Sequence, residues 1–234
     1  MRLRPDRRRP RRGRALRLGV ALAVAAGLAW WAREPLLAAV GDAVVAEDEP
    51  MHADVAVASL SDARTTAFEA ARLHRDGWVR KVVVFTWWDS KLDRTMRDLG
   101  VPVLTPDEAS VAILERLGVP PEAIEVRAEP VNGTGAEIAA LAALARERGL
   151  GGVVYVTARS HSARARWMLG RALAPGTAIA VRAPREDSFD PDGWWRSRDD
   201  ARELLAEIGR WANVVVLRDA WSSPPSSALR ADAR

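Results

Sequence analysis

The segment VVYVTARSHSARA, residues 153–165, joins an apolar run to side chains that can bind anions and transfer protons. Thr157 and Ser160 follow the run, and His161 and Arg164 are three residues apart, a spacing that puts two side chains on one face of a helix. An imidazole and a guanidinium beside free backbone amides suit a phosphate or carboxylate, and His161 can also transfer a proton near neutral pH. A surface histidine with local hydrogen bonds beside a solvated arginine would give the same pattern, so both interpretations stay open.

Two further segments carry candidate ligand contacts. In AEPVNGTGAE, residues 128–137, Thr134 is expected as the N-cap of a helix, with Glu137 three residues on completing a capping box. The glycines there permit close approach of a ligand, although the Lys and the spacing of a phosphate loop are missing. Arg64 follows the first apolar run of the domain and is expected to point toward the same edge, unless it is a solvated helix residue.

Short apolar runs rich in Val, Ile and Ala predict the strands that position these residues. Such runs are typical of strands buried on both faces of a parallel sheet. The predicted strands are residues 54–60, 81–86, 101–104, 124–128, 153–157 and 178–182.

Helical stretches are predicted between these strands, at residues 62–76, 91–99, 107–117, 136–148 and 162–173, with Gly77 ending the first. A last helix is predicted from residue 197, and its continuation Val214 to Val216 fits either helix or edge strand. The alternation predicts an α/β fold with a doubly wound, mostly parallel, Rossmann-like sheet. Ligands of such sheets bind beyond the carboxyl ends of the strands, where the candidate residues are expected to meet.

The N-terminus predicts a membrane anchor. Residues 18–32 are apolar and uncharged, nine arginines precede them within the first 17 positions, and Trp30 and Trp31 stand at their far end. We expect residues 1–17 to form a basic cytoplasmic tail, 18–35 a single transmembrane helix with Arg17 snorkelling, and 36–52 a connector. The domain at residues 53–221 then lies outside the cytoplasmic membrane, followed by a disordered tail at 222–234. A cleaved signal peptide fits the apolar length, but bulky tryptophans stand where a cleavage site needs small residues. A core helix with a nucleic-acid-binding arginine arm is a further alternative.

Charge and composition exclude several classes of function. The formal net charge is +4, but from Leu18 onward 26 basic residues face 30 acidic ones, so the domain lacks the charge of a nucleic-acid-binding protein. The absence of cysteine excludes disulfides and thiolate catalysis. No spacing of His and carboxylates predicts a metal, and no particular cofactor is indicated. A dinucleotide-dependent oxidoreductase is disfavoured because no Gly-x-Gly-x-x-Gly follows a strand.

The order of these features resembles the YdcF, SanA and ElyC-like family of envelope-associated proteins, over residues 54–217. The resemblance rests on the anchor, on Arg64-x-x-Ala67 before Gly77, on Gly118-Val119-Pro120, on the Thr134 loop and on Val156-Thr157 with His161 and Arg164. The last piece is the most specific, since the family pattern is Val-Thr-Ser-x-x-His-x-x-Arg.

The resemblance implies a Rossmann-like fold with a site formed by residues matching Arg64, Thr134, Glu137, Thr157, His161 and Arg164. It also implies a role in envelope or cell-wall biogenesis. The chain departs from the family pattern at Ser59-Leu60-Ser61, at Thr86-Trp87-Trp88 and at Gly133. Two of these changes replace small residues by bulky ones where a ligand would approach, which permits a divergent, non-catalytic member.

Two hypotheses about function follow. In the first, the protein handles a phosphorylated envelope precursor or a nucleotide-like ligand, with His161 as the catalytic acid or base and Arg64, Thr134, Glu137, Thr157, Ser160 and Arg164 as ligand contacts. It requires His161, Arg64 and Arg164 to surround one hollow. In the second, the domain is a non-catalytic module that binds or regulates a protein partner in the envelope, as the bulky Trp87 and Trp88 suggest.

Overall fold

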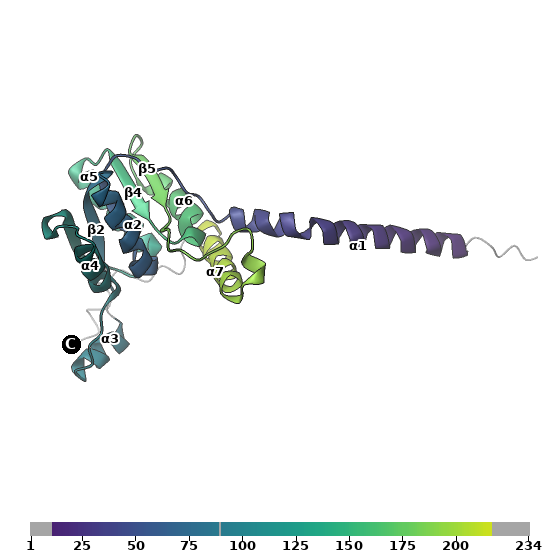
Figure 1. The fold of residues 1–234 in the computed structure, drawn as a ribbon, viewed down its shortest axis with the longest axis horizontal. Helices are drawn as coiled ribbons and strands as arrows, with labels where there is room; N and C mark the ends of the chain where they lie inside the picture. The colour runs from purple at the N-terminus through teal and green to yellow at the C-terminus, as the bar shows by residue number, and fades with distance from the viewer. Residues whose placement is uncertain (1–10, 89, 217–234) are drawn as a thin grey trace, which may run out of the picture.

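The apolar, β-branched runs of the sequence form parallel strands in the computed structural model, which describes residues 11–88 and 90–216 (Figure 1). The strands are β1 (Ala53–Ala58), β2 (Val79–Trp87), β3 (Ile124–Val131), β4 (Gly152–Val156) and β5 (Ala178–Arg182). Within the described residues they form one five-stranded sheet in the order β3-β2-β1-β4-β5, and every neighbouring pair is parallel. The prediction of an α/β fold with a parallel sheet is confirmed.

Four helices cover the two faces of this sheet: α2 (Ala63–Arg75), α4 (Pro106–Arg116), α5 (Thr134–Arg148) and α6 (Ser162–Ala172). The other helices in the described residues are the N-terminal α1 (Arg11–Asp42), α3 (Lys91–Asp98) and α7 (Arg198–Val215). The chain winds outward from β1 to β3, then crosses back to β4, so right-handed connections place α2 with α4 on one face and α5 with α6 on the other. The central strands are therefore buried on both sides, which explains runs such as Val82 to Val84.

The local signals at the helix ends were informative. Gly77 follows α2 with a φ of 80°, the left-handed conformation that glycine adopts without steric cost, as its place after the predicted helix indicated. Val214 and Val215 belong to α7, so the helical alternative for this segment is the right one.

The predicted strand at residues 101–104 is wrong. This segment joins α3 to α4 without pairing, and the side chains of Val101 and Leu104 are exposed. The sheet edge beside β2 is taken by β3, and Pro102 lacks the N–H that a further ladder would need. An apolar run of four residues is too short a signal to distinguish a strand from a loop.

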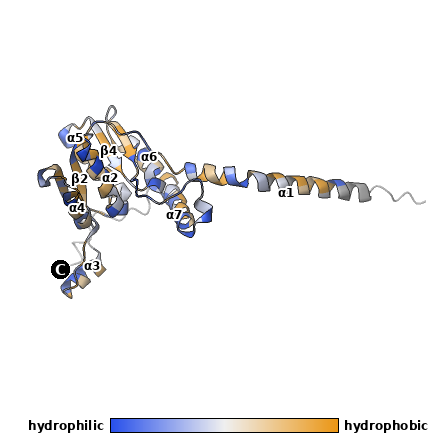
Figure 2. Cartoon of the chain, viewed as in Figure 1, coloured by the Kyte–Doolittle hydropathy of each residue, from blue (hydrophilic) through white to orange (hydrophobic). Residues whose placement is uncertain are grey.

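The helix α1 is longer than the predicted anchor. It begins at Arg11, inside the predicted basic tail, and continues through Pro35 to Asp42, inside the predicted connector, whose remaining residues are irregular. Its part from Arg17 to Asp42 is long and apolar enough to cross a membrane, and its most apolar stretch of 18 residues is not buried in the protein. Figure 2 shows this apolar helix extending away from the α/β unit. The predicted tail at 222–234 and the domain end at 217–221 lie outside the described residues.

A small second core joins α1 to the domain. Val44, two residues after the end of α1, packs with Phe189 and Leu204, and all three are buried. The half-buried ring of Trp194 packs against this cluster. The Trp194 Nε1 atom donates a 2.8 Å hydrogen bond to the carbonyl oxygen of Leu37 in α1. The connector then runs beside α6 and β5, where the N–H of Ala46 donates to Ser162 Oγ at 2.8 Å and that of Asp48 to the Val181 carbonyl at 2.9 Å. The helix α1 is thus attached near the carboxyl ends of the strands.

We expect Leu204→Ala to destabilise the protein by about 2–5 kcal/mol, since it removes a buried side chain and leaves a cavity between α7 and the segment that follows α1. Leu205→Ala is the matched control, because its side chain is 65% exposed, and should change stability by about 0.5 kcal/mol or less. The measurement is denaturant unfolding of the full chain in detergent. Equal losses for the two variants would contradict this account of the second core.

Candidate functional site

The loops that follow β1 and β4 meet at the carboxyl edge of the sheet. The two strands are neighbours, and the N–H of Ser59 extends their pairing by donating to the Val156 carbonyl at 3.0 Å. Beyond this bond the Oγ of Ser61 and the Oγ1 of Thr157 lie 3.1 Å apart. From β1 the chain turns to one face of the sheet and from β4 to the other, so this is the point where ligands of open parallel sheets bind.

A buried carboxyl group lies behind these hydroxyls. Glu137 of α5 is 2% exposed, and its Oε2 atom accepts a 3.2 Å hydrogen bond from Ser59 Oγ, which also receives the hydroxyl of Tyr155 at 3.2 Å. Its Oε1 atom is buried with no hydrogen-bond partner. Burial raises the pKa of Glu137 to about 8, although hydrogen bonds from Ser59, the Leu60 N–H and Tyr155 act in the opposite direction. The group is therefore mostly protonated at neutral pH. Carboxyl groups with pKa values shifted this far are found more often at functional sites than elsewhere.

The expected capping box at Thr134 and Glu137 does not form. The N-cap of α5 is Gly133, in an extended conformation, and no side chain caps the helix. Thr134 is the first helical residue and is half-buried. The reason is that the Glu137 side chain turns into the core toward Ser59 and so cannot reach back to the helix start.

His161 and Arg164 both bind a carboxylate that belongs to the protein itself. The Nδ1 atom of His161 lies 2.9 Å from Glu207 Oε2 in α7. Arg164 donates from Nε to Glu207 Oε1 at 2.5 Å and from Nη2 to Oε2 at 3.2 Å. Burial alone would raise the pKa of Glu207, but the hydrogen bonds from His161 and Arg164 outweigh it and lower that pKa. The guanidinium predicted to bind a ligand instead neutralises a buried carboxylate, whose side chain is fully buried.

Ser160 has a similar partner. Its buried hydroxyl donates to Glu203 of α7, and it also lies 3.2 Å from His161 Nδ1. Glu203 and Glu207 are four residues apart and thus share a face of α7. This face closes over η3 (Arg159–His161) and the start of α6.

Sequence reasoning missed both glutamates of α7. Leu204, Glu207 and Trp211 stand at i, i+3 and i+7, so Glu207 falls on the stripe by which α7 packs against the domain. A charged residue at such a position was the available signal, because a buried carboxylate requires partners. Its partners themselves were not deducible from spacing.

Arg64 is separate from this network. Its side chain is exposed on α2 and lines a pocket of about 360 Å³ with Phe68, Leu104 and residues of α4. That pocket contains none of the other predicted site residues, and within the described residues no hydrogen bond or ion pair joins Arg64 to His161 or Arg164. The structure therefore brings together Ser160, His161 and Arg164 around Glu207. Thr157 contacts Ser61, and the hydroxyl of Ser59 lies within hydrogen-bond distance of both Ser61 and Glu137. The pocket beside Arg64 does not include His161, so the expected meeting of these two residues is not seen there.

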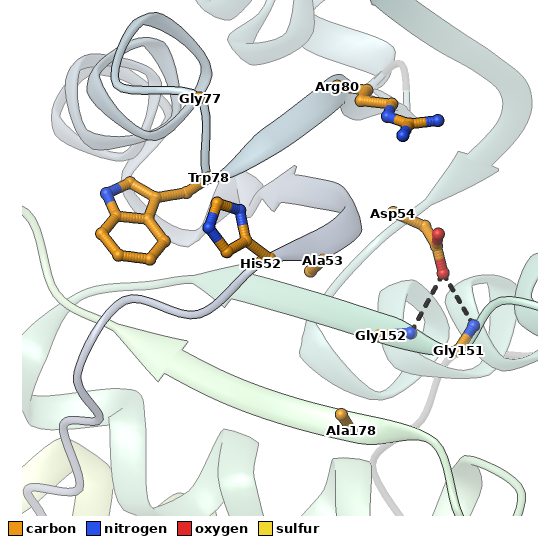
Figure 3. Close-up of a pocket in the computed structure, with 9 residues that line it drawn as sticks. All are labelled: His52, Ala53, Asp54, Gly77, Trp78, Arg80, Gly151, Gly152 and Ala178. Carbon is orange, nitrogen blue, oxygen red and sulfur yellow. Dashed lines mark hydrogen bonds between the residues drawn. The ribbon is translucent and has the colours of Figure 1, made fainter.

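A pocket of about 500 Å³ lies at the opposite, amino edge of the sheet (Figure 3). There His52 faces the ring of Trp78 at 4.8 Å between ring centres, and Arg80 stands at its rim. The Asp54 carboxylate accepts hydrogen bonds from the N–H groups of Gly151 and Gly152 at 2.7 and 3.0 Å. These bonds explain Asp54 as a link between β1 and β4, and none of the predicted site residues lines this pocket.

Comparisons of the chain with models of known families, with curated proteins and with solved structures find no match. In the part of the chain that the structure describes, no group of three or more His, Asp and Glu side chains is arranged to hold a metal ion. Interpretation of the site therefore depends on its own geometry.

Glu137→Gln should alter how stability depends on pH. The folded protein keeps a proton that the unfolded chain releases above its usual pKa of 4.5, so wild-type stability falls between about pH 4.5 and 8, by at most about 1.4 kcal/mol per pH unit. The variant lacks this contribution, and the stability difference between it and the wild type should change across that window and level off above pH 8. The measurement is denaturant unfolding at a series of pH values, with the exposed Glu115→Gln as control. A constant difference would show that Glu137 is ionised in the fold.

Arg164→Ala should cost about 3–5 kcal/mol, because it leaves the carboxylate of Glu207 buried with one partner fewer. The double variant Arg164→Met with Glu207→Leu removes both charges and should be clearly more stable than the single variant. Arg166→Ala, on the same helix, is the control: its ion pair with Asp48 is exposed and worth about 1 kcal/mol at most. Unfolding experiments that rank the double variant below the single one would refute a buried ion pair.

Proposed function

We propose that the chain is a single-pass protein of the cytoplasmic membrane whose Rossmann-like, doubly wound domain faces outward and handles an anionic ligand of the envelope. The strand order β3-β2-β1-β4-β5 supports the Rossmann-like assignment, because it is the order of the dinucleotide-binding sheet up to its fifth strand. The exposed apolar α1, with arginines before it and tryptophans after its apolar part, supports the anchor and its orientation.

The ligand we propose is a phosphorylated envelope precursor or a nucleotide-like molecule, bound at the crevice between β1 and β4. The observation that carries this proposal is the 3.1 Å contact between the Ser61 and Thr157 hydroxyls at the point where the sheet changes its direction of winding. Ser61 is exposed and Thr157 lies buried beside it. Hydroxyl groups of this kind can donate hydrogen bonds to phosphate oxygens. The resemblance to the YdcF-like family points to the same edge.

His161 is the residue we assign to proton transfer. A histidine whose Nδ1–H donates to a carboxylate is held in one tautomer, with the Nε2 lone pair left to accept a proton, and the carboxylate stabilises the imidazolium that forms. Glu207 is in position for this role at 2.9 Å. Arg164 then acts on Glu207 rather than on the ligand, while Arg64, exposed on α2, remains a proposed ligand contact.

A second candidate, a module that binds a protein partner, is favoured by α3. None of its residues is buried, and Leu92 and Leu99 on it and just after it are 67% and 74% exposed. Figure 1 shows this helix projecting from the rest of the domain. An exposed apolar helix face is a common feature of protein interaction sites.

Binding experiments on the full chain in detergent separate the two candidates. Inorganic phosphate, a uridine nucleotide and a short polyprenyl phosphate are the probes, and at least one should raise the melting temperature of the wild type. Ser61→Ala should weaken that binding about tenfold, since it removes a hydrogen bond to a charged group. Thr177→Ala, at the amino edge, should leave it unchanged. Failure of all three probes to bind the wild type would favour the partner-binding module.

A further inference from the structure

The short helix η4 (Trp194–Arg196) contacts α1. It contains two half-buried tryptophans, Trp194 and Trp195, and the exposed Arg196, and the exposed Arg198 follows it. Trp194 is held inward, since it packs on the second core and its Nε1 donates to the Leu37 carbonyl. Trp195 belongs to neither core cluster; the guanidinium of Arg196 stands 5.3 Å from the centre of its ring. Arg198 is exposed at the start of α7. We call Trp195, Arg196 and Arg198 the η4 surface.

The attachment of η4 to α1 fixes its height along the anchor. Arg196 pairs with Glu34 at 3.3 Å, and Gly41 approaches the backbone of Pro191 so closely that a Cβ atom would collide with it. Glu34 and Leu37 follow Trp31 by three and six residues, which corresponds to about 5–9 Å along a helix. The polar layer on each side of a bilayer is about 5–8 Å deep. With Trp30 and Trp31 at the edge of the hydrocarbon, η4 therefore lies level with the lipid headgroups.

We propose that the η4 surface is a second membrane contact, which rests on lipid headgroups and holds the carboxyl edge of the domain beside the bilayer. The composition suits this partner, since tryptophan favours the membrane interface and arginine binds lipid phosphate. The contact would keep the crevice between β1 and β4 near the membrane surface, where a lipid-linked phosphate is presented. This inference rests on the proposed function to the extent that α1 must span the membrane.

The absence of native cysteine makes single-site spin labelling a direct test. The full chain is placed in nanodiscs of phosphatidylcholine and phosphatidylglycerol with one label at a time. The labels are attached at Leu22→Cys in α1, at Asp199→Cys beside the η4 surface, and at Glu122→Cys, an exposed residue at the amino edge, as the aqueous control. Relaxation by molecular oxygen, against relaxation by a water-soluble nickel chelate, reports the depth of each label.

We expect the label at Leu22 to report hydrocarbon, that at Glu122 to report water, and that at Asp199 to lie between them at headgroup depth. Combining Trp195→Ser with Arg198→Ser should shift the Asp199 label toward the value at Glu122, with Trp194, Arg196 and Leu204 left intact to hold η4 and α7 to α1. A label at Asp199 equal to the aqueous control, or one that the double variant does not shift, would overturn the η4 contact while the anchor stands. An aqueous value at Leu22 would overturn the anchor and with it both proposals.

Discussion

The pairing of the buried Glu207 carboxylate with Arg164 and His161 is the interaction on which the position of α7 depends. A carboxylate removed from water is tolerated only with charged or hydrogen-bonding partners, and Glu207 has Arg164 on both oxygens and His161 on one. Its partners belong to η3 and α6, directly after β4, whereas Glu207 belongs to the last helix of the described chain. The ion pair therefore holds α7 against the carboxyl edge of the sheet.

This attachment reaches α1 through one further contact. Leu204, one turn before Glu207, packs with Phe189 and with Val44, which follows α1. The predicted ligand edge, α7 and the end of α1 thus share one region of the molecule. A displacement of α7 would therefore alter both the contact with His161 and the contact with the segment that follows α1.

Two buried glutamates of opposite character lie behind the loops that follow β1 and β4. Glu137 has only neutral partners, so burial raises its pKa to about 8, whereas the cations beside Glu207 lower the pKa of that group. Catalytic sites often hold two carboxyl groups whose surroundings shift their pKa values in opposite directions. The same residue type thereby offers a proton donor behind Ser59 and a fixed negative charge behind His161.

The sequence was informative where one local rule decided the structure. The valine-rich runs gave the strands, and the glycine after α2 gave its end, because periodicity and backbone conformation act within a few residues. The prediction of a strand at 101–104 failed because a four-residue apolar run also fits a loop, and β3 pairs with β2 in its place. The capping box predicted at Thr134 does not form, because the Glu137 side chain accepts a hydrogen bond from Ser59, which is 78 residues away in the sequence. Glu207 lies 43 residues from Arg164, and no spacing rule covers that distance.

The most direct test of the account is the tautomer of His161. Nitrogen-15 chemical shifts of the imidazole distinguish protonation at Nδ1 from protonation at Nε2, and His161→Gln identifies its signals among the three histidines. The account predicts that the neutral ring carries its proton on Nδ1, facing Glu207, and that Glu207→Gln abolishes this preference. A neutral ring protonated at Nε2 in the wild type would contradict it, since Nδ1 would then be an acceptor and Glu207 could not orient the residue for proton transfer.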